Sequence, residues 1–198
     1  MKIYLPLLYI YTLLFIGCGK PQKGYVIEGT LPSQVYDGEW IYLVPMENPM
    51  GRVDSVKIAN ASFSFSGKGE EMRVLRLRYA LRPYIQELLV ITEPGTIHVK
   101  ADSIGSVKGT PQNNALQEWK EMREKGMLVY RSIHEKLQNA IGDDSLRMVS
   151  VLDSLFVKEQ NFNYLFLQKQ KSNTLGKFMR KMLRVSLSNE QQHKLDEN

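Results

Sequence analysis

The chain has 198 residues, of which 43% are hydrophobic and 24% are charged, and it carries a formal net charge of +5 and one cysteine. These proportions are typical of a globular protein with one substantial domain or two small ones, and they exclude a wholly disordered or fibrous chain. A single cysteine excludes an internal disulfide, a Cys-x-x-Cys redox pair and a thiolate metal site.

The N-terminal segment has the pattern of a bacterial lipoprotein signal. Lys2 is a minimal positive region, residues 3–16 are mainly apolar, and Gly17 precedes Cys18 in a context that resembles a lipobox. The apolar run is shorter than the roughly 20 residues of a spanning helix. We expect residues 1–17 to be a cleaved signal peptide, Cys18 to be lipidated and residues 18–23 to be a polar tether. A retained membrane helix and a plain secretory signal are the alternatives.

Gly19 follows the cysteine where inner-membrane lipoproteins carry aspartate. By resemblance to lipoproteins, this residue favours the outer membrane, with the protein facing the periplasm. An exported lipoprotein rarely meets nucleic acid, so we expect no nucleic-acid partner. Anionic lipid or polysaccharide is the expected use of the positive charge.

Residues 24–110 have the pattern of a β domain. Segments rich in β-branched and aromatic residues recur every 8 to 12 residues or so, and turn signals such as Asp37-Gly38 and Glu93-Pro94-Gly95 separate them. Several segments alternate apolar and polar residues, as in Phe63 and Phe65 among serines. We expect an antiparallel β-sandwich or barrel whose core includes the aromatics Trp40, Tyr42, Phe63, Phe65 and Tyr79.

Residues 111–198 change to a helical period. Apolar residues fall at helical spacing after Thr110-Pro111, and breaks at 142–145 and 172–174 separate the predicted helices. Leu146 to Phe166 forms a long amphipathic stripe, 175–187 a shorter helix, and Ser188 with Gln191 a capping box for a last helix. The expected fold class is therefore α+β, with a β-sandwich or barrel-like N-terminal domain followed by a helical C-terminal segment.

The strand half resembles a known family. The features that carry the resemblance occur in a fixed order along the chain: Gly38, Ile41-Tyr42-Leu43, residues 53–60, Phe63, Phe65, Gly67, Glu93-Pro94-Gly95 and residues 107–110. The set resembles the N-terminal β domain of unknown function in Bacteroidetes-type lipoproteins, which often precedes a helical segment and a thioredoxin-like domain. The likeness extends over roughly residues 24–190. The chain ends at Asn198, where that domain would begin, and no residue here matches its redox cysteines.

No group of residues predicts catalysis or metal binding. His98, His134 and His193 are far apart in sequence, and no Gly-x-Ser-x-Gly motif occurs. Asp143-Asp144 lacks the spacing of a calcium loop and is better explained as a turn and helix cap. We assign no catalytic residue, no metal ligand and no cofactor.

Two basic groups are candidate docking surfaces. One contains Arg73, Arg76, Arg78 and Arg82, without an acid between Glu71 and Glu87. The other runs from Lys169 to Arg184, without an acid between Glu159 and Glu190, and includes Lys177, Arg180, Lys181 and Arg184. Either group is a solvated face or a docking surface for anionic lipid headgroups or an acidic partner. The residues that we select for docking are Arg76, Arg78, Arg180, Lys181 and Arg184.

The expected function is a non-enzymatic binding or scaffold module, attached to membrane lipid through Cys18 and able to bind an envelope protein. One alternative is an accessory component that docks a separate thioredoxin-like thiol–disulfide oxidoreductase. Another is a truncated relative without activity of its own.

Overall fold

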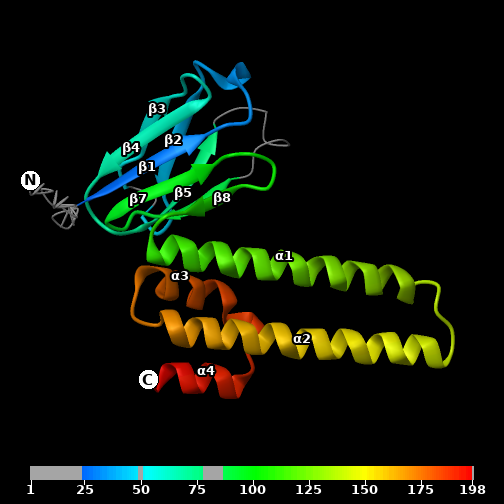
Figure 1. Cartoon of the computed structure of the whole chain (residues 1–198). Coiled ribbons are helices and arrows are strands. Elements are labelled where there is room, and N and C mark those ends of the chain that lie inside the picture. Colours follow the sequence, from blue (N-terminus) through cyan, green and yellow to red (C-terminus); the bar gives the residue numbers. More distant parts are fainter. Residues whose placement is uncertain (1–23, 49–50, 78–86, 198) are drawn as a thin grey trace, which may run out of the picture.

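A computed structural model describes residues 24–48, 51–77 and 87–197, and it places a β part against a helical part (Figure 1). The predicted signal peptide, the tether with Cys18, and Arg78, Tyr79 and Arg82 lie outside the described residues. The expected α+β class is confirmed, because strands precede four helices along the chain.

The β part consists of two four-stranded sheets. One sheet has the order β4-β1-β7-β8 and the other β3-β2-β5-β6. Strand pairs are antiparallel except β1 with β7, which are parallel. A parallel pair requires a long crossover, and the strands of the second sheet supply it here. The strands are β1 Tyr25–Thr30, β2 Trp40–Pro45, β3 Asp54–Lys57, β4 Ser62–Gly67, β5 Met72–Leu77, β6 Leu88–Ile91, β7 Gly95–Lys100 and β8 Ser106–Lys108.

The apolar faces of the two sheets form one core. Ile27, Leu43 and Ile97 are fully buried between the sheets, and Phe63 and Phe65 are buried beside them. Trp40 was expected in this core, and that prediction is wrong. It is 43% exposed because Ile41 and Leu43 take the inward face of β2, and the Lys57 ammonium lies 5.5 Å from its ring centroid.

The helical part begins with a long antiparallel hairpin. Figure 1 shows α1 beneath the strands and α2 alongside it, with the far end of the hairpin extending beyond the β part. A 3-10 turn, η1 Gln34–Tyr36, lies between β1 and β2. The predicted capping box of Ser188 and Gln191 is confirmed at the last helix. The helical elements are α1 Pro111–Leu137, α2 Asp143–Gln170, α3 Thr174–Leu183, the 3-10 turn η2 Arg184–Ser186 and α4 Asn189–Asp196.

A second apolar core joins the two parts. Met72 of β5 and Ile91 of β6 pack in a cluster with Leu175 and Met179 of α3, and all four are at most 1% exposed. The stripe of α2 contributes to this core only near its C-terminal end, where Leu167 is buried.

A polar network reinforces the same junction. Glu93 is 5% exposed, and its Oε1 accepts hydrogen bonds from the backbone N–H groups of Gln112 and Asn113 at 2.7 and 3.1 Å. The side chain of Gln112 donates to Glu70 at 2.8 Å and accepts from the backbone N–H of Leu175 at 2.9 Å. The N-termini of α1 and α3 are thereby held against the β part.

Candidate functional site

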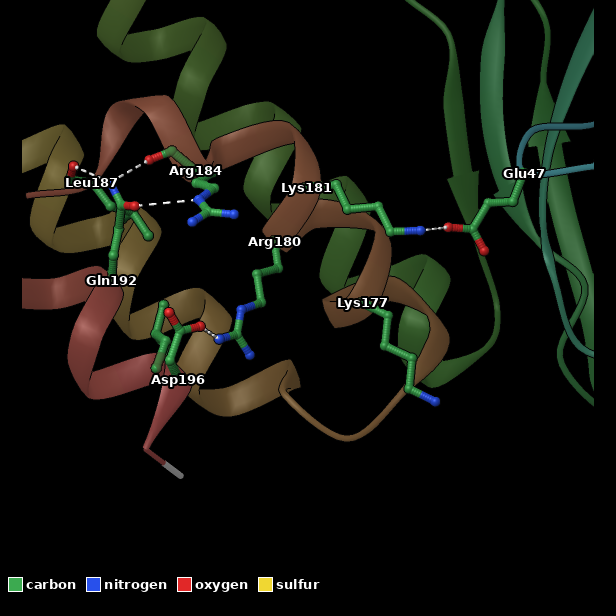
Figure 2. A pocket seen from close by; sticks show the side chains of 9 residues that line it. Glu47, Lys177, Arg180, Lys181, Arg184, Leu187, Gln192 and Asp196 are labelled. Atoms are coloured by element: carbon green, nitrogen blue, oxygen red, sulfur yellow. Dashed lines mark hydrogen bonds and ion pairs between the residues drawn. The ribbon is translucent and has the colours of Figure 1, made fainter. Parts of the chain in front are cut away.

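A cationic groove lies between α3 and α4, facing the loop after β2 (Figure 2). It encloses about 400 Å³. Lys177, Arg180, Lys181 and Arg184 contribute four positive charges, and Leu187 and Leu195 add apolar surface. The residues of this α3–α4 groove are Glu47, Lys177, Arg180, Lys181, Arg184, Leu187, Gln192, Leu195 and Asp196.

The sequence of α3 explains why the cations gather there. Leu175, Met179 and Leu183 recur every four residues and are buried against the rest of the protein. Lys177, Arg180, Lys181 and Arg184 follow the spacing i, i+3, i+4, i+7 and occupy a separate face of the helix. The Asn173 side chain accepts from the Gly176 N–H at 2.8 Å and begins the helix.

Two of the four cations are held by carboxylates that sequence reasoning missed. Lys181 Nζ lies 2.6 Å from Glu47 Oε1, and Arg180 forms an ion pair with Asp196 (Figure 2). Glu47 is 134 residues away from Lys181 in sequence, so no local pattern links them. Asp196 lies at the end of α4, and the capping box is the sequence feature that predicts where this helix begins.

The other two cations form no ion pair with a carboxylate among the described residues. Hydrogen bonds from Thr174 and Gln112 lower the pKa of Glu70, and the nearby charge of Lys177 adds to this shift. Arg184 Nε donates to Gln192 Oε1 at 3.4 Å, and Lys177 makes no ion pair within the part of the chain that the structure describes. Gln192 also donates to the carbonyls of Arg184 and Leu187 at 3.0 and 3.1 Å. It thus satisfies carbonyl groups at the end of η2 while orienting Arg184. Arg184 and Lys177 remain available to an anionic ligand.

The structure does not bring the two predicted basic groups together. Arg76 lies on β5 opposite Tyr42 of β2, with its Nε 3.7 Å from Glu87 Oε1, and it does not line the groove. Arg78, its predicted neighbour, is outside the described residues.

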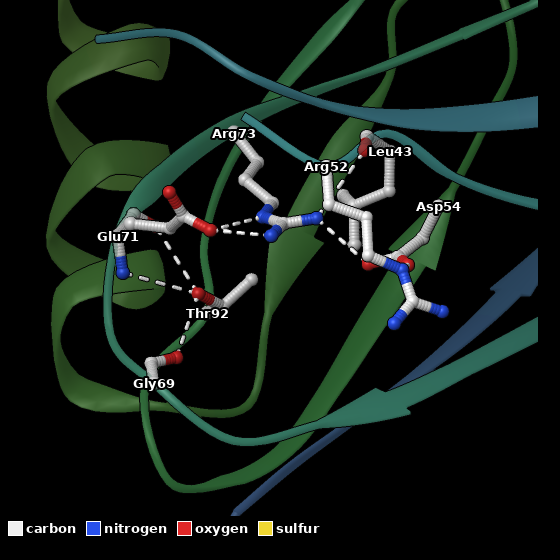
Figure 3. Close-up of polar contacts among 7 residues, drawn as sticks. All are labelled: Leu43, Arg52, Asp54, Gly69, Glu71, Arg73 and Thr92. Atoms are coloured by element: carbon white, nitrogen blue, oxygen red, sulfur yellow. Dashed lines mark hydrogen bonds and ion pairs between the residues drawn. The ribbon is translucent and has the colours of Figure 1, made fainter. Parts of the chain in front are cut away.

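Arg73, on the same strand, belongs to an ion-pair network and is largely buried (Figure 3). Its guanidinium donates to Asp54 Oδ2 at 2.8 Å and to Glu71 Oε1 at 2.6 Å. Sequence reasoning counted the acids between arginines and missed Asp54, which comes from another strand of the same sheet. Arg73 is therefore a structural cation that joins β3 to β5.

The three histidines are separated as their sequence positions suggested. His98 Nδ1 lies 3.4 Å from Glu28, His193 Nδ1 lies 3.1 Å from Glu197, and His134 stacks on Tyr130. Within residues 24–48, 51–77 and 87–197, no three metal-ligating side chains converge. In the same ranges, no helix combines the length and apolar character needed to cross a bilayer.

Comparison with known proteins agrees with the resemblance of the strand half. Residues 25–116 match the family model described as a domain of unknown function (DUF4369). The match covers every described strand and the first turns of α1, and of the groove residues it includes only Glu47. No curated protein and no solved structure matches the chain.

Proposed function

We propose that this protein is a lipid-anchored, non-enzymatic binding module of the bacterial cell envelope, and that the α3–α4 groove docks an acidic segment of a partner protein. One observation carries the proposal: four cationic side chains line one concave site that contains only two carboxylates. A partner carboxylate fits Arg184 directly, because guanidinium groups bind carboxylates with two parallel hydrogen bonds.

The geometry favours an acidic protein segment over a membrane surface. Inside the groove, Arg180 is paired with Asp196 and Lys181 with Glu47. The other N–H groups of these two cations can donate hydrogen bonds to an incoming carboxylate. Leu187 and Leu195 supply apolar contact for a peptide between its acidic residues. A flat layer of headgroups, in contrast, would meet mainly the rim of a concave site.

The groove is tested with a labelled hexaglutamate peptide and fluorescence anisotropy. Neutral R180Q/K181Q/R184Q removes three charges without setting carboxylates against one another, and we expect it to weaken peptide binding about tenfold or more. The matched control K68Q/K169Q/K171Q removes three charges from exposed positions outside the groove and should bind like wild type. Equal weakening in both variants would contradict a specific groove.

Phosphatidylglycerol vesicles test whether the groove binds lipid headgroups instead of an acidic peptide. Wild type should bind the peptide and should show no groove-dependent binding to phosphatidylglycerol vesicles. If R180Q/K181Q/R184Q abolishes vesicle binding and leaves peptide binding unchanged, the groove is a headgroup site and the proposal is wrong.

The proposed anchor is supported by Lys2, the apolar run of residues 3–16 and the lipobox-like context of Cys18. A diacylglycerol and a further acyl chain bind firmly, since each buried methylene contributes about 0.8 kcal/mol. Wild type should incorporate labelled palmitate and fractionate with outer membranes, and C18A should incorporate none. Labelled C18A would refute the anchor without affecting the groove.

The accessory role remains the second candidate, because the order of sequence features over roughly residues 24–190 resembles lipoproteins in which such a domain often precedes a thioredoxin-like domain. Groove-dependent capture of a purified thioredoxin-like oxidoreductase would favour that role. Turnover of a disulfide or ester substrate by the purified protein would contradict a non-enzymatic function.

A further inference from the structure

The far half of the α1–α2 hairpin lacks a core of its own. We define the distal hairpin as residues 122–159, and none of these residues is buried. The half-buried residues Ile133, Leu137, Leu152 and Leu155 mark the seam between its two helices. Many other apolar side chains are at least 44% exposed, namely Met122, Met127, Leu128, Val129, Tyr130, Ile141, Leu146, Val149, Val151, Phe156 and Val157.

Part of this apolar surface forms a stripe beside the seam. Val149 and Phe156 are seven residues apart on α2, and Met127 and Tyr130 are three residues apart on α1. In an antiparallel pair, helical periodicity places these four side chains on the same flank of the seam. The flank has the spacing of the inner positions of a helical bundle.

Such a face is unusual in a monomer. Helices in proteins gain most of their stability from packing an apolar face, and a monomer rarely exposes a large contiguous apolar patch. At 1.5 Å per residue, sixteen residues of each helix present a face about 24 Å long and about 20 Å wide. This is the size of the smaller specific protein–protein interfaces.

Charge indicates what covers the face. Residues 122–137 of α1 contain four Lys/Arg and two Asp/Glu, whereas residues 143–159 of α2 contain two Lys/Arg and four Asp/Glu. A two-fold axis that runs parallel to the helices places α1 of each copy against α2 of the other, so that opposite net charges meet twice. An anionic membrane would attract α1 and repel α2.

We propose that the distal hairpins of two copies of this chain pair about a two-fold axis as a four-helix bundle. Both β parts then lie at the same end of the bundle, because the hairpin of each copy extends beyond its β part (Figure 1). The proposal is independent of the α3–α4 groove, none of whose residues belongs to the distal hairpin.

The oligomeric state tests the proposal. The purified full chain is studied by sedimentation equilibrium in density-matched detergent, and we expect a concentration-dependent dimer. V149E/F156E places two charges in the stripe and should weaken the dimer at least about 100-fold, with helicity unchanged. The control V35E/V185E changes two valines that are 73% and 94% exposed outside the distal hairpin, and it should dimerise like wild type.

A charge exchange is the second test, and it keeps the proposal falsifiable when V149E/F156E does not fold. Arg131 lies four residues after Met127 and Asp153 four residues after Val149, so both are on the flank of the stripe. R131E should weaken the dimer, and adding D153K to the same chain should restore it. A wild type that remains monomeric across the concentration range would overturn the proposal. So would a dimer that V149E/F156E and R131E both leave unchanged. Binding of the monomer to phosphatidylglycerol vesicles through the stripe would assign the face to the membrane instead.

Discussion

The Asn113 side chain completes the hydrogen bonding of an edge strand. Its Oδ1 accepts from the backbone N–H of Ile91 at 3.0 Å, and its Nδ2 donates to the Ile91 carbonyl at 2.7 Å and to Thr110 at 2.8 Å. The residue is fully buried. One amide thus replaces the neighbouring strand that β6 lacks at the edge of its sheet.

Replacing Asn113 should therefore be costly. N113A leaves the N–H of Ile91 unsatisfied in a buried place, although the Ile91 carbonyl keeps the hydrogen bond from the Glu93 N–H. We expect a loss of about 1–3 kcal/mol in the free energy of unfolding, measured with urea. N113D keeps an acceptor and loses a donor, so it should also destabilise. N139A, at an exposed position in the turn of the hairpin, is the matched control. Equal stability of N113A and N139A would contradict this role.

Asp102 gives a residue-level prediction about pH. A hydrogen bond from Lys100, together with backbone N–H groups of Gly105 and Ile104, lowers the pKa of Asp102 to about 2. A carboxyl whose folded pKa is depressed stabilises the fold above its ordinary pKa near 3.8, and this contribution is lost as pH falls towards 2. Carboxyl-carbon NMR should show a titration midpoint near 2, and K100Q should raise it. A midpoint near 3.8 in wild type would refute the hydrogen bonding.

Among the elements, α1 is capped from a distance. Thr110 occupies the N-cap position, but its side chain does not accept from a backbone N–H of the helix. Instead, Glu93, from the turn before β7, accepts from the first N–H groups of the helix. A carboxylate at a helix N-terminus is also favoured by the helix dipole. The turn at residues 93–95 therefore serves both sheet and helix.

We expect E93A to lower the free energy of unfolding by about 1–2 kcal/mol, because two N–H groups and the Gln112 amide lose an acceptor. E93Q keeps one acceptor and should lose less. The measurement is urea denaturation combined with hydrogen exchange of the α1 amides, and E118A on the exposed face of α1 is the control. Exchange at the start of α1 that stays unchanged in E93A would show that another group caps the helix.

These elements also show which features of the structure can be predicted from the sequence. The capping box at Ser188 was predictable because both partners lie within three residues, and Phe63 and Phe65 were predictable from a two-residue period. Glu93 and Glu47 were not, because their partners are 19 and 134 residues away. Periodicity predicted the apolar face of α2, but it could not predict that only the C-terminal part of this face packs in a core.

At the scale of the whole molecule, the packing between the β part and the helical part predicts that both parts unfold in one transition. Met179 is fully buried in the core shared by strands and helices, and the Glu93–Gln112 network spans the same boundary. Trp40 lies in the β part and Trp119 in the helical part, so the two tryptophans report on the two sides separately.

In each single-tryptophan variant, W40F and W119F, the urea transition followed by tryptophan fluorescence should coincide with the one followed by far-UV circular dichroism. M179A should shift both by the same amount, about 2–5 kcal/mol, because it removes buried volume from the shared core. The conservative variant M179L should cost less than about 1.5 kcal/mol. Two separate transitions, or a shift confined to the Trp119 signal, would mean that the parts unfold independently.

The position of β1 inside its sheet has a consequence for how the chain folds. β1 is the first strand of the chain, yet it pairs with β4 and with β7, whose residue Gly95 lies opposite Tyr25. Closing a loop of that length costs conformational entropy before the contacts form, and non-local pairing slows folding. If the chain is exported as proposed, it emerges N-terminus first and keeps β1 unpaired on one edge until about 70 further residues have followed. On that proposed route, we expect folding to finish only after β7 has been released, and a chaperone that covers β1 in the meantime should speed it.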